Sequence, residues 1–479
     1  MPDVSTVAPR GFFLNGKWHT QGKCVDIHSP YDQSVVGSVT LAGQRELEHA
    51  IESAVEAFET TRKMPSYQRQ AILHKVSIGI QNRKEEFARM MALEAGKPIR
   101  TARAECDRAI FTFQIAAEES TRIGGEYLPM DLQDFTAGRW GMVKRFPLGP
   151  IAAITPFNFP LNLVAHKVAP AIAAGCSMVL KPAPQTPITA LMLAEVVHEA
   201  GWPAGALNVL PLANEDAELM VTDDRLKMLT FTGSGKVGWQ LKAKSGKKKV
   251  VLELGGNAGV IIHSDADLEY AAERCAVAGY SYAGQSCISV QRILVHRSAF
   301  DKFLAAFLGR VDKLKCGDPL QETTDIGPLI RPSDVERAMA WVGEAEKAGA
   351  KVLRGGKAHG SVMEPTVLTN TKPEMRVNCE EVFAPVKTVE PYDDFEAAIR
   401  HINNSAYGLQ AGIFTRDAKL LFHAYEQLEV GGVIAGDVPT FRIDHMPYGG
   451  VKDSGLGREG LRYAIEEMTE PKLLVMNLR

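Results

Sequence analysis

The sequence predicts an α/β protein built on parallel sheets, and three observations support this prediction. Residues 44–120 are rich in charge and carry apolar side chains at helical spacing. From residue 143 onward, short β-branched runs alternate with helical stretches, which is typical of a parallel sheet with crossover helices. The length of 479 residues suggests about three domains, and a hydrophobic content of 45% can fill large cores.

The expected elements follow one another in a regular order. Helices are expected over residues 46–58, 66–95 and 102–119, with Gly96 and Pro98 ending the second of them. Strands are expected over 151–155, 177–180, 207–211 and 228–232, with a helix over 188–200. A second α/β segment is expected from Glu253 to about residue 440, with strands at 260–263, 292–295 and 411–415 and a helix from Leu268. Ligands bind beyond the carboxyl ends of such strands, so the residues that follow each strand are the candidates for function.

The C-terminal run 472–476 is typical of a strand, but no later strand exists to pair with it. Residues 141–146, far upstream, are also strand-like. An isolated strand leaves its edge groups unpaired, and adding it to the sheet of another subunit would satisfy them. The sequence therefore predicts a homo-oligomer.

Composition and charge exclude several classes of protein. The formal charge of −3 argues against nucleic acid as a partner, and no apolar run is long enough to span a membrane. The start MPDVSTVAPRGFF lacks the pattern of a signal peptide. Seven cysteines without a C-x-x-C pair fit a reducing, cytoplasmic location, with neither a disulfide framework nor a metal site expected.

A glycine-rich segment, residues 232–238, follows a predicted strand and matches G-x-G-x-x-G. Such a turn lets backbone N–H groups approach a pyrophosphate at a helix N-terminus, although a plain strand–helix turn is equally compatible. Glu253 lies about where a ribose-binding acid would be expected. It also stands at the end of the first α/β segment, just before Gly255 and Gly256, and could serve chemistry instead.

Four further short motifs carry candidate residues. Cys287 in GQSC could be a reactive thiolate with a lowered pKa, or a buried structural cysteine. Asn158 in TPFNFP could donate to an oxyanion or form part of a turn. Lys181 at a strand end could bind a ribose or phosphate or be a solvated lysine, and the EEVFAP segment at 380–385 could position a cofactor or be a simple loop.

Together and in this order, the motifs resemble the aldehyde dehydrogenase superfamily over nearly the whole chain. They are TPFNFP, KPAPQTP, FTGSGKVG, LELGG, GQSC, EEVFAP and MPYGGVKDSGLGREG. The resemblance implies a three-domain α/β fold. Its parts would be a Rossmann-type cofactor domain over 1–121 and 146–252, an α/β catalytic domain over 253–441, and a small β oligomerisation part with the tunnel loop over 122–145 and 442–479. It also implies a homodimer or homotetramer formed through the C-terminal strand.

The resemblance assigns the chemistry to three residues. Cys287 would attack an aldehyde, and the Asn158 amide and the Cys287 backbone N–H would stabilise the oxyanion, each such donor being worth about 3–4 kcal/mol. Hydride would pass to NAD or NADP and leave a thioester, which water activated by Glu253 would hydrolyse. A coenzyme-A-acylating enzyme, which would not need Glu253, and a nucleotide-binding protein without turnover are the alternatives.

Cofactor and substrate contacts follow from the same resemblance. The implied cofactor contacts are Thr155, Pro156, Lys181, Pro184, Gly233, Ser234, Leu254, Glu381 and Phe383. Pro184 stands where strictly NAD-using members carry an acid, so NADP is expected to be at least tolerated.

The implied substrate contacts are Asn162, His166, Ser286, Arg442 and, less directly, Arg103. They favour a short hydroxylated or singly anionic aldehyde, as in the branch that acts on lactaldehyde. Alternatively, Arg442 pairs with Asp444 or another acid and does not meet the substrate.

Overall fold

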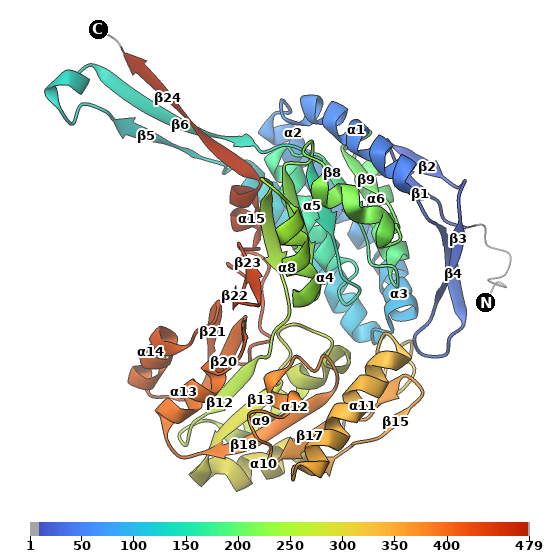
Figure 1. Ribbon diagram of the computed structural model, residues 1–479, viewed down its shortest axis with the longest axis vertical. Coiled ribbons are helices and arrows are strands. Elements are labelled where there is room, and N and C mark those ends of the chain that lie inside the picture. The colour runs from blue at the N-terminus through green and yellow to red at the C-terminus, as the bar shows by residue number, and fades with distance from the viewer. Residues whose placement is uncertain (1–8, 478–479) are drawn as a thin grey trace.

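A computed structural model describes residues 9–477 of the protein. Two α/β bodies lie one above the other in Figure 1, and a narrow β arm projects from the upper body. The start of the chain, for which the sequence predicts no signal peptide, falls largely on residues 1–8, outside the described residues. Among the helices of residues 9–477, none combines the length and the apolar character needed to cross a membrane.

The upper body is built on an eight-stranded sheet with the order β2-β1-β9-β8-β7-β10-β11-β23. Its strands are β1 (Phe12–Leu14), β2 (Lys17–His19), β7 (Ile151–Ile154), β8 (Met178–Lys181), β9 (Leu207–Val209), β10 (Met228–Thr232), β11 (Lys249–Glu253) and β23 (Gly455–Leu456). The five strands from β9 to β11 are parallel, as predicted. The strand order reverses between β7 and β10, so the residues that follow these two strands border one crevice.

Nine helices of the described chain surround this sheet (Figure 1). They are α1 (Gln44–Thr61), α2 (Ser66–Asn82), α3 (Lys84–Ala95), α4 (Ile99–Ser120), α5 (Asn162–Ala174), α6 (Pro187–Glu199), α7 (Glu218–Thr222), α8 (Gly235–Lys244) and α15 (Leu461–Glu467). The helical prediction for 44–120 is confirmed, but a single helix over 66–95 is wrong. The backbone of Arg83 leaves helical geometry (φ −107°, ψ 18°), so α2 ends there and a new helix begins at residue 84. The Arg83 guanidinium pairs with Glu86 and Glu195 at this break.

The lower body is built on a seven-stranded sheet with the order β14-β17-β18-β13-β12-β20-β21, in which only β14 is antiparallel. Its strands are β12 (Gly259–Ile262), β13 (Arg292–His296), β14 (Lys351–Arg354), β17 (Thr366–Thr369), β18 (Val386–Tyr392), β20 (Gln410–Phe414) and β21 (Gly432–Ala435). Its helices are α9 (Leu268–Tyr280), α10 (Arg297–Val311), α11 (Pro332–Lys347), α12 (Arg376–Cys379), α13 (Phe395–Asn403) and α14 (Ala418–Gln427).

Three short strand pairs complete the two bodies. They are β3 (Cys24–His28) with β4 (Val35–Thr40), β15 (Ala358–His359) with β16 (Val362–Met363), and β19 (Tyr407–Gly408) with β22 (Val451–Lys452).

The arm is a three-stranded antiparallel sheet with the order β24-β6-β5, formed by β5 (Gly125–Pro129), β6 (Arg139–Pro147) and β24 (Thr469–Asn477). The C-terminal strand is therefore not left alone, because it pairs along its whole length with β6 of its own chain. It still forms one edge of the arm, and its outer edge is free of a neighbouring strand among the described residues. The α15 side chains of Leu461 and Ile465 join the core of the upper body, so among the described residues 442–477 only β24 extends into the arm.

Candidate active site

A cavity of about 420 Å³ lies where the two bodies meet, in the size range of small-molecule sites. Its walls come from the loops after β7, β10 and β11, from helices α4 and α5, and from helix α11 and loops of the lower body. The lining residues are Arg108, Pro156, Phe157, Asn158, Phe159, Asn162, Leu163, Thr232, Gly233, Ser234, Glu253, Leu254, Gly255, Ser286, Cys287, Ile288, Asp334, Arg337, Trp341, Glu381, Phe383, Arg442, Tyr448 and Glu459. The predicted trio of Cys287, Glu253 and Asn158 is thus brought together in one cavity.

Cys287 lies in a tightly constrained loop between the helical turn Ser281–Gly284 and β13. Tyr282, Ala283 and Gly284 are left-handed in succession, with φ of 48°, 54° and 72°. A Cβ on Gly284 would come within 2.4 Å of the Ala384 carbonyl oxygen, and a Cβ on Gly256 within 2.1 Å of the Cys287 carbonyl oxygen. The glycines flanking the nucleophile loop therefore allow backbones to approach more closely than any side chain permits.

The sulfur of Cys287 faces the Tyr448 hydroxyl at 3.0 Å. Burial raises the pKa of Cys287 to about 12, and the hydrogen bond with Tyr448 opposes this rise. The lowered pKa expected from the sequence is therefore wrong for this structure, because the surrounding protein removes the sulfur from water. A base must take the thiol proton before the sulfur can attack.

Asn158 lies in the loop after β7, within the cavity wall. Its Nδ2 donates one hydrogen bond to the Gln285 carbonyl oxygen at 3.0 Å, which ties it to the nucleophile loop. A side-chain amide has a second N–H, which remains for an oxyanion. The loop is anchored from behind by Glu105, whose carboxylate accepts the backbone N–H groups of Leu161 and Asn162 at 2.9 and 3.0 Å.

Glu253 ends β11 and is 3% exposed, and neither of its carboxylate oxygens has a hydrogen-bond partner in the described part of the chain. Burial raises the pKa of Glu253 well above its usual value, and the neighbouring Glu459 carboxylate adds to this effect. A carboxylate with a raised pKa is suited to accept a proton near neutrality.

The predicted cofactor contacts divide into two groups. Pro156, Gly233, Ser234, Leu254, Glu381 and Phe383 line the cavity, whereas Thr155, Lys181 and Pro184 lie outside its wall. Ser234 is the N-cap of α8, so the helix presents its backbone N–H groups beside Gly233.

Two buried charged groups flank this part of the cavity. Glu381 accepts the Gly256 N–H at 2.8 Å, and burial raises the pKa of Glu381 to about 7. Lys181 donates to Asn214 at 3.0 Å, and burial lowers the pKa of Lys181 to about 8. A helix N-terminus, a buried lysine and a carboxylate fit the pyrophosphate and riboses of NAD(P).

The predicted substrate contacts also divide. Asn162, Ser286 and Arg442 line the cavity. His166 lies behind the wall, fully buried, with its Nε2 2.7 Å from the Asp444 carboxylate. Arg103 is not part of the cavity, because its guanidinium faces outward and pairs with Glu85 and Glu322, so the prediction that it lines the substrate wall is wrong.

Arg108, Tyr448 and Glu459 are among the lining residues that the sequence did not predict, and Lys167 pairs with Glu459 beside the cavity. Arg108 lies on the same helix as Arg103 but on a different face, since five residues turn an α-helix by about 140° beyond a full turn. The spacing of apolar residues in α4 could have shown which face is inward. Tyr448 and Glu459 both lie in the motif MPYGGVKDSGLGREG, but nothing in the sequence indicates their contacts.

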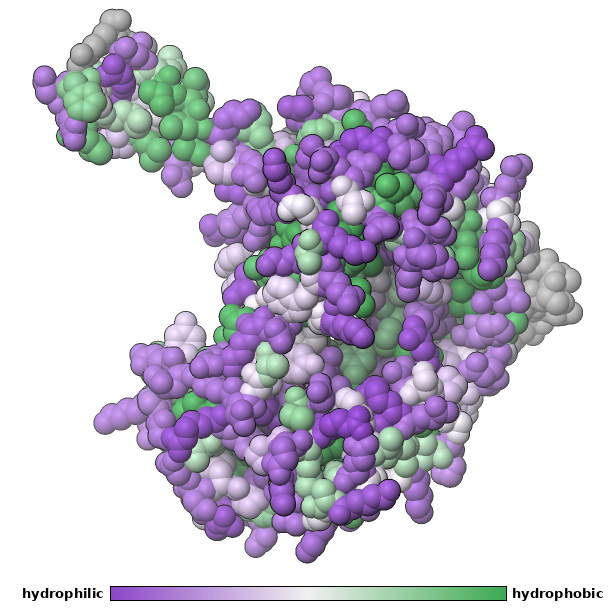
Figure 2. All heavy atoms as spheres, in the orientation of Figure 1, coloured by the Kyte–Doolittle hydropathy of each residue, from purple (hydrophilic) through white to green (hydrophobic). Residues whose placement is uncertain are grey.

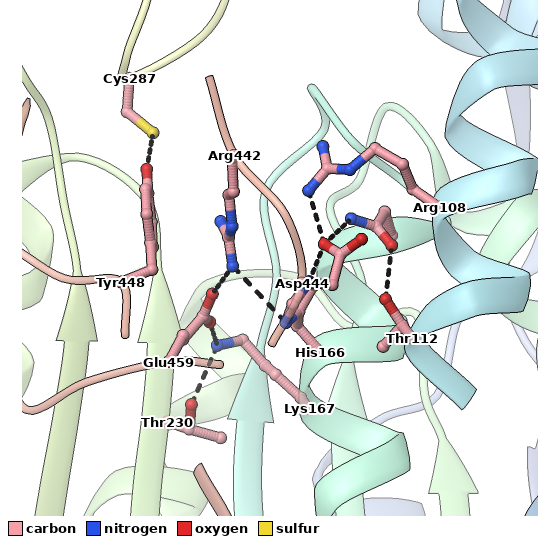
Figure 3. Close-up of polar contacts among 11 residues, drawn as sticks. Arg108, Thr112, His166, Lys167, Thr230, Cys287, Arg442, Asp444, Tyr448 and Glu459 are labelled. Atoms are coloured by element: carbon pink, nitrogen blue, oxygen red, sulfur yellow. Dashed lines mark hydrogen bonds and ion pairs between the residues drawn. The ribbon is translucent and has the colours of Figure 1, made fainter. Parts of the chain in front are cut away.

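Arg108 and Arg442 belong to a network of charged side chains, drawn in Figure 3. Arg442 pairs with Glu459 at 2.9 Å, and Glu459 also meets Lys167 at 3.4 Å. Asp444 does not pair with Arg442. It accepts from Arg108 at 2.7 Å instead. Arg442 thus pairs with an acid, Glu459, and also lines the cavity, so the pairing does not remove it from the cavity wall.

Comparison with known proteins gives consistent results. Residues 18–474 match the family model described as the aldehyde dehydrogenase family. A 3-sulfolactaldehyde dehydrogenase from Priestia megaterium is 44% identical over 479 residues, which is 100% of both chains.

Two solved structures superpose closely. Aldehyde dehydrogenase 21 from Physcomitrella patens, in complex with the reaction product succinate, has a TM-score of 0.96 and 46% identity, covering 98% of this chain and 99% of that one. A glyceraldehyde-3-phosphate dehydrogenase from Methanocaldococcus jannaschii, complexed with NADP, has a TM-score of 0.91 and 39% identity, covering 95% of this chain and 99% of that one. The resemblance predicted from the motifs is confirmed.

Proposed function

The chain belongs to the aldehyde dehydrogenase family and is an NAD(P)-dependent aldehyde dehydrogenase, and we propose that its substrate is a short aldehyde carrying a negative charge. The observation that supports this is a pair of guanidinium groups at the cavity. The Nε atoms of Arg108 and Arg442 are both buried and have no hydrogen-bond partner among the described residues. Both residues line the cavity, and guanidinium groups in a cavity wall favour an anionic group on the bound molecule.

Two of the similar proteins are named for, or were solved with, molecules of this chemical class. The Priestia relative is named for sulfolactaldehyde, and the Physcomitrella structure holds succinate. Sulfonate and carboxylate groups both accept planar hydrogen bonds from guanidinium. A short, singly anionic aldehyde, with or without a hydroxyl, is therefore the substrate we assign.

The residues of the cavity supply each step of the reaction. Glu253 takes the proton of Cys287, and the sulfur attacks the aldehyde carbon. The free N–H of Asn158 and the Cys287 backbone N–H stabilise the resulting oxyanion. Bound beside Gly233, Ser234, Glu381 and Phe383, NAD or NADP supplies the hydride acceptor. Once Glu253 has passed the first proton on to solvent, it removes a proton from water, which attacks the thioester and releases the acid.

The substrate assignment is tested with Arg108→Gln, and Arg103→Gln on the same helix is the matched control. Loss of a charged hydrogen bond predicts that kcat/KM for succinic semialdehyde falls by about 10- to 100-fold in the Arg108 variant. For a neutral aldehyde of similar length, kcat/KM should change by less than about threefold, because the lost bond is made only to the charge. Steady-state kinetics on both aldehydes give the ratio. An equal loss on both, or none, would contradict the assignment.

The cofactor preference follows from Pro184, which is exposed just after β8 and carries no charge to repel a 2′-phosphate. We propose that NADP is at least tolerated, with the nearby Lys181 able to meet the added charge. Steady-state rates with both cofactors test this. A preference for NAD of about a hundredfold, or about 2.7 kcal/mol, would overturn it.

We also infer that the chain assembles with copies of itself through the arm. The apolar side chains of Tyr127, Met142, Leu473, Leu474 and Val475 are each 42–69% exposed there, and Figure 2 shows apolar surface gathered on the arm. A free strand edge beside exposed apolar groups supports a second copy as the occupant. Sedimentation velocity at micromolar concentration tests this, and a monomer would rule it out.

The seven free thiols support a cytoplasmic location.

A further inference from the structure

The hydroxyl of Tyr448 contacts the atom that would carry the reaction. It lies 3.0 Å from the Cys287 sulfur, and this sulfur is its hydrogen-bond partner in the described chain. The phenol is 3% exposed and packs with Ile288 and Leu409. The tyrosine oxygen therefore contacts the sulfur at hydrogen-bond distance from within a cluster of apolar side chains.

The position of this ring is fixed from two directions. The backbones of Tyr448 and Glu459 exchange two hydrogen bonds, of 3.0 and 2.6 Å. The Arg442 guanidinium lies 3.7 Å from the ring centroid and is itself bonded to Glu459 at 2.9 Å (Figure 3). Moving the hydroxyl away from the sulfur would break the stacking on Arg442, so the contact is built into the fold.

The direction of the hydrogen bond follows from the acidity of the two groups. Burial raises the pKa of Tyr448 well above its usual value, so the phenol keeps its proton. Once Cys287 has given its proton to Glu253, the thiolate can only accept, and the phenol O–H must be the donor. A charge-assisted hydrogen bond of this kind favours the ionised form of the acceptor. The Arg442 cation over the ring strengthens the O–H as a donor.

We propose that Tyr448 is a catalytic residue that donates a hydrogen bond to the Cys287 thiolate and thereby sets the reactivity of the nucleophile. This rests on the proposed function in one respect, namely that Cys287 is the nucleophile. Arg442 acts as a positioning residue for Tyr448 in addition to its proposed contact with the substrate. One arginine therefore touches both the predicted anion site and the group that activates the sulfur.

The test is the rate of alkylation of Cys287 by iodoacetamide as a function of pH, in wild type and Tyr448→Phe. It uses the full chain without aldehyde and is quantified for each cysteine by mass spectrometry. We expect alkylation of Cys287 at neutral pH to slow by about tenfold, with the pH midpoint moving up by about one unit. Exposed Cys24 and Cys316 serve as internal references, and buried Cys106, Cys176 and Cys275 stay unlabelled while the fold is intact.

The matched control is Tyr280→Phe, which removes a buried hydroxyl that donates to the Thr366 carbonyl oxygen. It should leave the Cys287 profile unchanged. An unchanged or faster alkylation of Cys287 in Tyr448→Phe would overturn the proposal, because the hydroxyl would then be neutral or merely cap the thiol.

If Tyr448→Phe exposes the buried cysteines, a second variant that keeps the shape of the ring is used instead. Incorporation of 3,5-difluorotyrosine at position 448 makes the phenol a stronger donor, and alkylation of Cys287 should become faster, while a slower rate would contradict the proposal. No aldehyde is present in these assays, so their failure leaves the substrate assignment untouched.

Discussion

Cys287→Ala is expected to lower kcat/KM for any aldehyde substrate by more than about 10⁴-fold, the scale seen when a covalent nucleophile is lost. Alanine removes the sulfur that bonds to the carbonyl carbon, and no other cysteine lines the cavity in the described chain. The initial burst of reduced cofactor should disappear as well. Stopped-flow and steady-state measurements of cofactor reduction provide both readouts.

The control for this variant is Cys316→Ala, which changes an exposed thiol outside the cavity. Its activity should stay within about twofold of wild type, as is usual for a surface substitution. If Cys287→Ala kept more than a tenth of the wild-type rate, the covalent route would be wrong. A nucleotide-binding protein without turnover would instead show no activity in any of the three forms.

Glu253→Gln is expected to slow both steps in which Glu253 takes a proton, first from Cys287 and then from water. The amide keeps the shape of the side chain but cannot accept a proton, so steady-state turnover should fall by about 10²- to 10⁴-fold. Any burst of reduced cofactor should not exceed one equivalent per subunit, because the thioester cannot be hydrolysed to regenerate Cys287. Rapid-quench detection of the thioester by mass spectrometry checks this.

Glu390→Gln is the matched control, since Glu390 is a partly buried glutamate outside the cavity that accepts hydrogen bonds from Thr371. It should retain nearly full activity. Steady-state turnover of Glu253→Gln close to wild type would contradict the role of Glu253. A strict requirement of the wild type for coenzyme A would indicate the acylating alternative.

The principal chemistry could be predicted because it is encoded locally. Asn158 and Gly233 follow strands of a parallel sheet and Glu253 ends one, and the topology of such sheets brings the ends of neighbouring strands to one edge. The motif around Cys287 carries its own glycine, whose left-handed backbone the loop requires. These features need only the order of elements and the residue types.

The rest depends on tertiary contacts that a single sequence does not contain. The apolar spacing in α4 indicates which face of the helix is inward, but only the packing of α4 places Arg108 at the cavity. The raised pKa of Cys287 arises from burial by both bodies. The N-terminal strands β1 and β2 were not predicted because each has only three residues, too few to show alternation.

The segment from Arg442 to Glu459 has a consequence for how this enzyme could diversify. Within eighteen consecutive positions, it carries the Arg442 cation, the Asp444 carboxylate, the phenol beside the sulfur and the Glu459 acid that pairs with Arg442. Its strand β23 then adds to the edge of the upper sheet. Recombination that replaces this segment would change two properties together. They are the selectivity for the anionic end of the substrate and the reactivity of the Cys287 nucleophile. A substitution in this segment that changes the substrate selectivity would therefore also change the reactivity of Cys287.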